Sequence, residues 1–323
     1  MRQKIVAAAA ALAILASGGL VGCSNGDDGS AKASGDFPSV QVAKDKTKAP
    51  EIGKGSGKAP KKLESRVIRE GKGAAIKKTD TVSVDYVGQT WQGNVFDQSY
   101  NKTSGPAVFP LEGVIPGWQD GLAGKHVGDR VELVIPPDQA YGDQEQKDAS
   151  GKVTIPKKST LVFVVDILGH IDTTDLSALS KAKETGNKIP DWLTISGKLG
   201  AKPTVKLKEG AEAPTEQQVI ILAEGKGPAI GADDYVAAHV TAVPFGNTDQ
   251  AVSTWDRGGM QVTQGPVGSS PMYNGIKIGT RALVMTPKGT ASNEQAVPAA
   301  VYVVDYGAKM SSVRADSEKA KKK

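Results

Sequence analysis

The chain contains two copies of one sequence plan, and this repeat limits its possible folds more than any other feature. The segments VIREGKGAAIKKTDTVSVDYV, from Val67, and IILAEGKGPAIGADDYVAAHV, from Ile220, share E-G-K-G, an apolar pair, a polar turn and an alternating stretch. Further along, residues 127–137 match 278–288 and residues 159–168 match 299–308. Matched blocks in one order predict two domains of about 100 residues, an ordinary domain size.

The apolar periodicity of the first copy is that of strands. Side chains alternate between apolar and polar along three stretches, which puts the apolar members of each on one face. An antiparallel sheet with one covered face is therefore expected. The apolar sets are Val82, Val84 and Tyr86; Val131, Leu133 and Ile135; and Leu161, Phe163, Val165 and Ile167.

Helix signals are few, and the best one is PGWQDGLAGK at residues 116–125. Pro116 suits a first helical turn, and Gly124 lies near the expected end. Trp118 would then point from the start of the helix into the concave face of the sheet. The fold class expected is α+β, mostly β, with two domains that are each a curved antiparallel sheet wrapped on one short helix.

The first residues have the composition of a secretory signal. Arg2 and Lys4 precede an Ala/Leu/Ile run and then small residues. A retained membrane span is the alternative, although the run is short and Ala-rich for the ~20 residues a span needs. Cys23, the single cysteine, directly follows Leu-Val-Gly, and LVGC resembles the lipobox of bacterial lipoproteins. That resemblance implies a lipid on Cys23, whereas a buried thiol is the ordinary alternative.

Composition divides the rest of the chain. Residues 24–60 are rich in Gly, Ser, Lys, Ala and Pro, which predicts a flexible tether. A second polar stretch separates the two copies. The boundaries expected are a signal peptide at 1–22, a tether at 23–60, a first domain at 61–171, a linker at 172–215, a second domain at 216–308 and a basic tail at 309–323.

Charge and motif content exclude several functions. The net charge of +5 lies largely in the ends of the chain, and aromatic and basic residues are not interleaved, so no nucleic-acid partner is expected. His126, His170 and His239 form no metal-binding or triad spacing, and no nucleophile elbow or dinucleotide fingerprint occurs. GKGSGK at 53–58 fails as a phosphate loop because Ala59 follows the lysine. No metal and no cofactor are expected.

Residues 62–170 resemble the FKBP-type peptidyl-prolyl cis–trans isomerases. The motifs that carry the resemblance occur in order: VDYVG with Tyr86, VFDQS with Phe96 and Asp97, VIPGW at 114–118, AYG at 140–142 and IPKKSTLVFVVDIL at 155–168. Each motif is weak alone, and together they are specific. The family usually has another aromatic residue where this chain has Ala107. The long polar loop after Tyr141 has no counterpart of the family's loop histidine.

The resemblance implies a role for each matched residue. Trp118 is the floor under a substrate proline ring, Val114 and Ile115 are walls, and the Ile115 N–H is a donor to the substrate backbone. Tyr141 is a hydroxyl donor to a substrate carbonyl, and Asp97 is a polar rim. The side walls are Tyr86, Phe96 and Phe163. Taken singly, the tyrosine and phenylalanine on strands read as core residues, and the aspartate as a turn residue.

The second copy departs from this pattern. Trp255-Asp256 is expected in place of Phe96-Asp97, and Tyr302 in place of Phe163. Met272 lies roughly where the floor tryptophan should be, no AYG follows, and His239 or Val240 takes the place of Tyr86. A degenerate FKBP-like domain without most of its isomerase activity is expected.

The leading hypothesis is a lipid-anchored isomerase on the extracytoplasmic face of the cell membrane. It would speed X–Pro isomerisation in exported polypeptides by stabilising the twisted amide in an apolar pocket, without a covalent step. The alternative is a non-catalytic peptide-binding or holdase lipoprotein that uses FKBP-like grooves. The partners expected are unfolded or proline-containing exported chains and the membrane, and macrolide ligands stay open.

Overall fold

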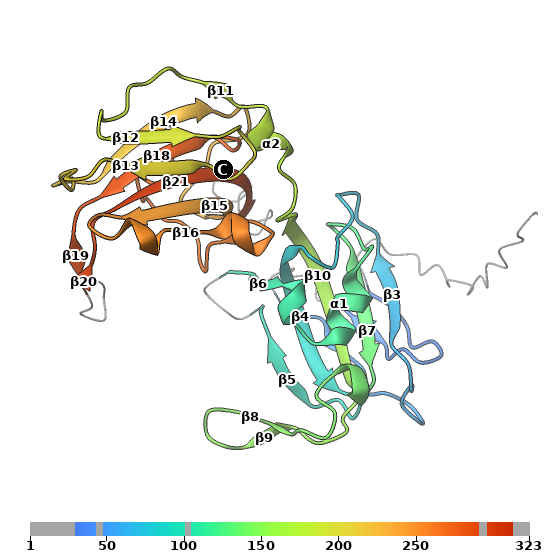
Figure 1. Ribbon diagram of the computed structural model, residues 1–323. Coiled ribbons are helices and arrows are strands. Elements are labelled where there is room, and N and C mark those ends of the chain that lie inside the picture. Colours follow the sequence, from blue (N-terminus) through green and yellow to red (C-terminus); the bar gives the residue numbers. More distant parts are fainter. Residues whose placement is uncertain (1–29, 43–47, 101–104, 291–295, 313–323) are drawn as a thin grey trace, which may run out of the picture.

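The computed structural model describes residues 30–42, 48–100, 105–290 and 296–312. Two antiparallel sheets form separate bodies that are joined end to end by the long strand β10 and the chain after it (Figure 1). Cys23, the signal segment and most of the basic tail lie outside the described residues. Among the helices that are described, none has the length and apolarity to span a membrane.

The first sheet has six strands in the order β3-β7-β10-β4-β5, and β6 also pairs with β4. Its strands are β3 (Glu64–Arg69), β4 (Thr81–Thr90), β5 (Val95–Gln98), β6 (Ala107–Pro110), β7 (Arg130–Ile135) and β10 (Leu161–Ile171). Short elements between them are η1 (Leu111–Gly113), η2 (Pro137–Gln139) and the hairpin of β8 (Gln146–Lys147) and β9 (Val153–Ile155). All three alternating apolar sets belong to one buried cluster on the concave face, as the periodicity predicts.

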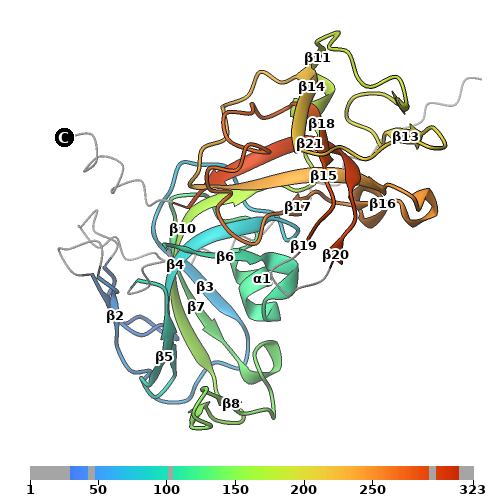
Figure 2. The same cartoon turned by 90° about the vertical axis from the view of Figure 1, so that its left-hand side faces the viewer.

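Helix α1 (Pro116–Leu122) lies against the concave face of this sheet, where a helix was expected (Figure 2). Its residues Trp118 and Leu122 are buried against the sheet. Two glycines let the helix come close: a Cβ on Gly117 would lie 2.3 Å from Cγ2 of Ile135, and one on Gly121 would lie 2.6 Å from a methyl of Leu133. The helix is thus pressed onto β7, which orients the indole toward the sheet.

Residues 30–42 and 48–60 differ from the flexible tether that their composition predicts. They form a small hairpin of β1 (Val40–Gln41) and β2 (Glu51–Ile52). Ile52 of this hairpin, together with Phe37 and Ala59, packs against a second cluster on the outer face of the first sheet, which contains Trp91. That sheet is therefore covered on both faces. We call residues 30–42 and 48–60 the N-terminal strap.

The stretch between the two sheets also differs from a plain linker. It contains α2 (Ser177–Ser180), β11 (Lys183–Glu184) and a hairpin of β12 (Leu193–Ser196) and β13 (Thr204–Leu207). Leu193 is buried on Leu283 and Val301 of the second sheet. The hairpin thus covers the outer face of the second sheet, as the strap covers that of the first.

The second sheet repeats the strand order of the first. Its order is β11-β14-β18-β21-β15-β16, with β17 paired to β15, so that β14, β18, β21, β15, β16 and β17 follow the sequence of β3, β7, β10, β4, β5 and β6. The bounds are β14 (Gln218–Glu224), β15 (Asp234–Pro244), β16 (Val252–Ser253), β17 (Gln261–Val262), β18 (Arg281–Thr286) and β21 (Ala300–Ser311). Also present are η3 (Thr248–Gln250), η4 (Thr254–Arg257), β19 (Gly289–Thr290) and β20 (Ala296–Val297).

The second sheet lacks the helix that we expected it to wrap. Between β17 and β18, all of which is described, residues 263–280 form turns and no helix. Gly275 has a φ of +81°, a left-handed conformation that does not continue a helix. The hydroxyl of Tyr306 donates to the carbonyl of Met272 and holds this turn segment on the sheet instead. The helix expected at this place of the repeat is therefore absent, and the helix that does pack on this sheet, α2, comes from the segment before it.

The two sheets meet at a small apolar cluster of their own. Ile171 at the end of β10 packs with Ala237, Met260 and Met310 of the second sheet. The N–H of Met260 donates to the carbonyl of Thr173 at 2.8 Å, directly after β10. These contacts form a seam that fixes the ends of β10 and β21 beside each other.

Candidate functional site

Three aromatic rings meet between α1 and the first sheet. The indole of Trp118 lies edge-on to the rings of Tyr86 and Phe163, with centroids 5.4 and 5.2 Å away and interplanar angles of 87° and 88°. Phe96 from β5 packs edge-on to Phe163 at 5.5 Å. Edge-to-face rings at this spacing attract each other and hold their orientation. The helix and three strands thus bring four rings together. We call the rings of Trp118, Tyr86, Phe163 and Phe96 the ring cluster.

A glycine on the central strand makes room for this arrangement. A Cβ on Gly88 would lie 2.5 Å from a ring carbon of Phe163 and 2.8 Å from one of Phe96. Such contacts are far inside van der Waals distance, so any side chain at residue 88 would displace one of the two rings. The ring cluster therefore requires the glycine of the VDYVG motif, Gly88, for its packing.

One carboxylate faces the cluster at its rim. The hydroxyl of Tyr86 donates to Oδ2 of Asp97, and the N–H of Gln98 donates to Oδ1 of the same residue at 2.8 Å. Burial and the nearby Asp97 carboxylate raise the pKa of Tyr86, so its phenol stays protonated at neutral pH. Asp97 thus accepts a hydrogen bond from a backbone amide, although it lies within β5 and not in a turn, and it also positions a ring of the cluster.

The remaining expected residues lie around the rings with more solvent contact. Val114 and Ile115 are half-buried and pack against the cluster core. Ile115 is the N-cap of α1, so its N–H lies outside the hydrogen bonds of the helix. Tyr141 follows η2 and is 36% exposed. Burial, and then the Asp97 charge, raise the pKa of its hydroxyl, which places the two groups near each other and keeps the hydroxyl a donor.

Two further residues belong to this site, although neither of them has a role predicted from the sequence. Phe109 on β6 lies 6.0 Å from Tyr86 and 5.7 Å from Trp118, ring centroid to centroid. Ile155 at the end of β9 is buried in the same cluster. The signal for Phe109 was present as its alternation with Leu111, whereas Ile155 follows a polar loop whose return to the core no periodicity shows.

The structure thus brings all eight expected site residues to one end of the first sheet, between α1, β5 and η2. Three of them, Tyr86, Trp118 and Phe163, are 4–5% exposed and form a closed floor. The others are more exposed and form a rim with one carboxylate and one hydroxyl. This arrangement offers apolar surface and hydrogen-bond donors, and none of the eight residues is a serine, threonine, cysteine or lysine.

Each sheet contains a buried arginine–aspartate ion pair, and these two pairs show which positions of the sheets correspond. Arg130 on β7 binds Asp166 on β10 through both Nε and Nη2, at 2.8 and 2.5 Å. Arg281 on β18 binds Asp305 on β21 in the same way, at 2.7 and 3.0 Å. Each pair is buried and spans facing positions of two strands. Positions in the two sheets can therefore be matched residue by residue.

Val240, and not His239, takes the position of the cluster tyrosine. His239 faces Asp305 in the register that Asp85 has with Asp166, so the next residue along β15 matches the tyrosine of β4. His239 stacks on Trp255 at 3.7 Å instead. Burial lowers the pKa of this imidazole to about 4, so it is neutral at pH 7.

The expected match of Trp255-Asp256 to the Phe-Asp pair of β5 is wrong. The hydroxyl of Thr254 accepts the N–H of Val240, as the hydroxyl of Ser99 does for the cluster tyrosine. Trp255, which follows Thr254, therefore takes the position of Tyr100, which follows Ser99. In strand register Tyr302 does take the place of Phe163. The second sheet keeps one ring position of the cluster and fills the tyrosine position with valine.

Comparisons with known proteins match the first sheet, which carries the ring cluster. A sequence model of the family described as "FKBP-type peptidyl-prolyl cis-trans isomerase" matches residues 72–168, which span the ring cluster. A probable FK506-binding protein of Corynebacterium glutamicum is 38% identical over 121 residues, which are 37% of this chain and 96% of that protein. The chain belongs to the FKBP-type peptidyl-prolyl cis–trans isomerase family.

Longer FKBP relatives share only this region. FkpA of Escherichia coli K12 is 46% identical over 103 residues, which are 32% of this chain and 36% of that protein. A crystal structure of Escherichia coli FkpA is 44% identical and covers 33% of this chain and 47% of that one, with a TM-score of 0.30. The chain thus spans about a third of the length of the FkpA sequence it matches.

Proposed function

We propose that the first domain, residues 61–171, is a peptidyl-prolyl cis–trans isomerase that acts on proline-containing polypeptides. The observation that carries the proposal is the ring cluster: Trp118 lies edge-on between Tyr86 and Phe163, beneath a rim that holds Asp97 and Tyr141. An apolar floor with a few donors at its edge is the arrangement that this reaction needs. Family membership supports the same activity.

The reaction breaks no bond, which fits a site whose eight residues include no serine, threonine, cysteine or lysine. Rotation about an X–Pro amide crosses about 18–20 kcal/mol because the twisted amide loses resonance. The twisted amide has less charge separation than the planar one, so an apolar site favours it. Each tenfold gain in rate needs only about 1.4 kcal/mol of preferential binding. Trp118 would lie under the proline ring, while the Ile115 N–H and the Tyr141 hydroxyl would hold the flanking carbonyls.

A protease-coupled assay of a proline peptide tests the proposal on the full chain. Trp118→Ala and Phe163→Ala are expected to lower kcat/KM at least about tenfold, because each removes part of the floor. Tyr302→Ala, the matching change in the second sheet, is the control and should leave turnover within about twofold of wild type. Equal losses in the Phe163 and Tyr302 variants would contradict the assignment of activity to the first domain.

We infer further that the second domain, residues 216–308, is a degenerate FKBP-like copy. Its strand order and buried ion pair support common ancestry with the first domain. Its missing helix and the valine at the tyrosine position support loss of activity. This loss also favours the second candidate function, that of a non-catalytic peptide-binding or holdase lipoprotein. A full chain that shows no turnover and still binds unfolded polypeptides would support this second function.

We propose that the chain is a lipoprotein anchored through Cys23 to the extracytoplasmic face of the cell membrane, where it meets exported polypeptides. The LVGC motif and the absence of any other cysteine support this location. Labelled palmitate should enter wild-type protein and should not enter Cys23→Ser. Labelling that persists in the variant would place the lipid elsewhere.

A further inference from the structure

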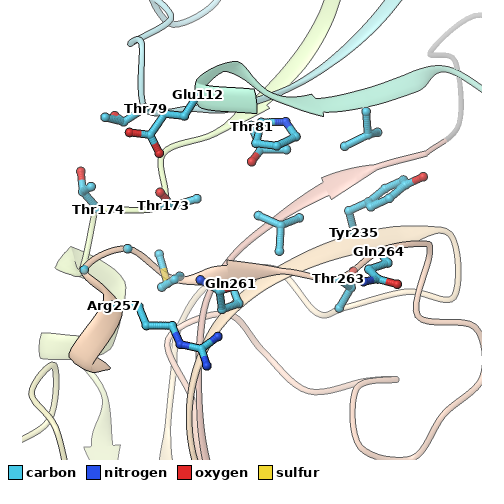
Figure 3. Close-up of a pocket in the computed structure, with 16 residues that line it drawn as sticks. Thr79, Thr81, Glu112, Thr173, Thr174, Tyr235, Arg257, Gln261, Thr263 and Gln264 are labelled. Carbon is cyan, nitrogen blue, oxygen red and sulfur yellow. The ribbon is translucent and has the colours of Figure 1, made fainter. Parts of the chain in front are cut away.

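A cavity of about 620 Å³ lies between the two sheets, away from the ring cluster. Its first wall is built by Thr81, Val108 and Pro110, and its second wall by Gln261, Val262 and neighbouring residues (Figure 3). The volume is in the range of sites that hold a ligand. Nothing in the isomerase mechanism uses this space.

The first wall is an open strand edge. Among the described strands β6 pairs with β4 alone, and the N–H of Leu111 donates to the carbonyl of Asp80 at the end of that ladder. Backbone groups of an antiparallel edge strand point alternately to its partner and away. Leu111 points to β4, so the N–H and carbonyl of Val108 and the carbonyl of Pro110 point away from it, on the side of the cavity.

The second wall is an open edge of the same kind. Within the part of the chain that the structure describes, β17 pairs with β15 alone, and the N–H of Thr263 donates to the carbonyl of Val236. By the same alternation, the backbone groups of Val262 and Met260 point away from β15. The N–H of Met260 already binds the carbonyl of Thr173 at 2.8 Å. An extended chain beside this edge would continue that pairing to the N–H and carbonyl of Val262.

The side chains of the cavity suit an extended segment that is uncharged except at one end. Val108, Val262 and Tyr235 pack on the apolar seam that forms its base, and threonines and glutamines line the rest. Glu112 lies on the first wall and Arg257 on the second, both at the end of the cavity near Thr174 (Figure 3). Both are exposed, and among the described residues neither has an ion-pair partner. A bound segment with one basic and one acidic residue would complement both charges.

We propose that this cavity binds an extended polypeptide segment by strand addition, separately from the isomerase site. Main-chain hydrogen bonds to an exposed sheet edge supply affinity in such binding, and the alternate side chains supply selectivity. The ligand class is a segment of alternating small apolar and uncharged polar residues with one basic and one acidic residue at the same end. The proposal rests on the proposed function only in that the ligand is part of the same polypeptide client. Binding at two sites would then raise the effective concentration of the client prolines at the ring cluster.

Fluorescence anisotropy with a labelled, proline-free peptide tests the proposal on the full chain. The peptide alternates valine and threonine and carries a lysine and a glutamate together at one end. Val262→Pro and Val108→Pro each remove one edge N–H while keeping an apolar side chain, and edge strands tolerate proline. Each is expected to weaken binding at least about fivefold, the effect of one lost hydrogen bond. Arg257→Gln should weaken binding of this peptide more than that of one lacking the glutamate.

Two controls separate this site from the ring cluster. Val252→Pro changes an exposed valine on β16, outside the cavity, and should bind the peptide like wild type. Trp118→Ala should lose turnover and keep its peptide affinity. Wild-type protein that does not bind the peptide, unchanged affinity in both edge variants, or loss of binding in Trp118→Ala would each overturn the proposal. Because the peptide has no proline, binding that depends on the edges would support the cavity even if the chain showed no isomerase activity.

Discussion

At the scale of single residues, absent side chains shape the candidate site as much as the rings do. Gly88 lies under Phe163 and Phe96, and Gly117 lies under α1 against Ile135. In each case a methyl group would overlap a ring or a side chain of the core. The rings can meet edge-on only because the backbone beneath them carries no side chain at these points.

The variant Gly88→Ala tests this requirement. The added methyl would displace Phe163 or Phe96, so we expect turnover to fall at least tenfold and the free energy of unfolding to fall by about 1–3 kcal/mol, as for other overpacked cores. Proline-peptide kinetics and urea unfolding measure the two effects. Gly265→Ala, where the methyl would meet nothing within 4 Å, is the matched control. Full activity in Gly88→Ala would show that the rings can be rearranged at no cost.

A buried carboxyl in the first sheet makes stability depend on pH. Burial raises the pKa of Glu132 to about 7, although its ion pair with Arg66 lowers it. The folded protein therefore holds this proton between pH 4.5 and 7, where the unfolded chain has released it. Stability should fall as the pH rises through that window, by up to about 3 kcal/mol, and should level off above it.

The variant Glu132→Gln should flatten this dependence because the amide does not titrate. Urea unfolding at pH 5 and at pH 7.5 measures the difference in the free energy of unfolding. Glu70→Gln, a change at an exposed residue directly after β3, is the control and should keep the pH dependence of the wild type. An unchanged slope in Glu132→Gln would assign the pH dependence to another group.

At the scale of elements, each sheet is covered on its outer face by the segment that precedes it in the chain. The N-terminal strap covers Trp91 and Val162, and the β12–β13 hairpin covers Leu283 and Val301. Composition does not reveal this, because a few apolar side chains in a polar segment are enough when a sheet presents a large matching face. The strap is also fixed by polar contacts: Arg66 lies over the ring of Phe37, with its Cζ 4.6 Å from the ring centroid.

The variant Gly55→Ala should release the strap. A Cβ at residue 55 would lie 2.0 Å from the Trp91 ring, and the N–H of Gly55 donates to the carbonyl of Trp91. We expect faster amide exchange in residues 51–58 and a loss of about 1–3 kcal/mol in the free energy of unfolding. Ser56→Ala, at an exposed neighbour, should change neither. Wild-type exchange in the Gly55 variant would mean that the strap is held elsewhere.

At the scale of the whole molecule, the seam between the sheets is small and apolar. Met310 is 7% exposed and lies against Gly169, where a Cβ would approach its side chain to 3.1 Å. Interfaces of this kind allow relative motion unless they are large. The seam therefore decides whether the two sheets unfold together.

The variant Met310→Ala should uncouple them. Removing this side chain from the seam should lower the free energy of unfolding by about 2–5 kcal/mol. It should also divide the single calorimetric unfolding transition expected of the wild type into two. Met285→Ala changes a methionine buried inside the second sheet and should lower one transition without creating a second. A single transition in Met310→Ala would show that the seam does not couple the sheets.

The sequence by itself determined the repeat, the antiparallel sheets, the helix at Pro116–Leu122 and the eight residues that gather at the ring cluster. These follow from local rules: apolar periodicity, turn residues and motif spacing depend on neighbours along the chain.

Only the tertiary structure decided which residues outside these patterns join the core. It placed Phe109 and Ile155 at the site, folded the expected tether and linker onto the outer faces, and matched Trp255 to Tyr100. It also brought the edges of β6 and β17 to one cavity. The physical reason is that register and packing depend on contacts between residues far apart in the chain, and no pattern of neighbours encodes those contacts.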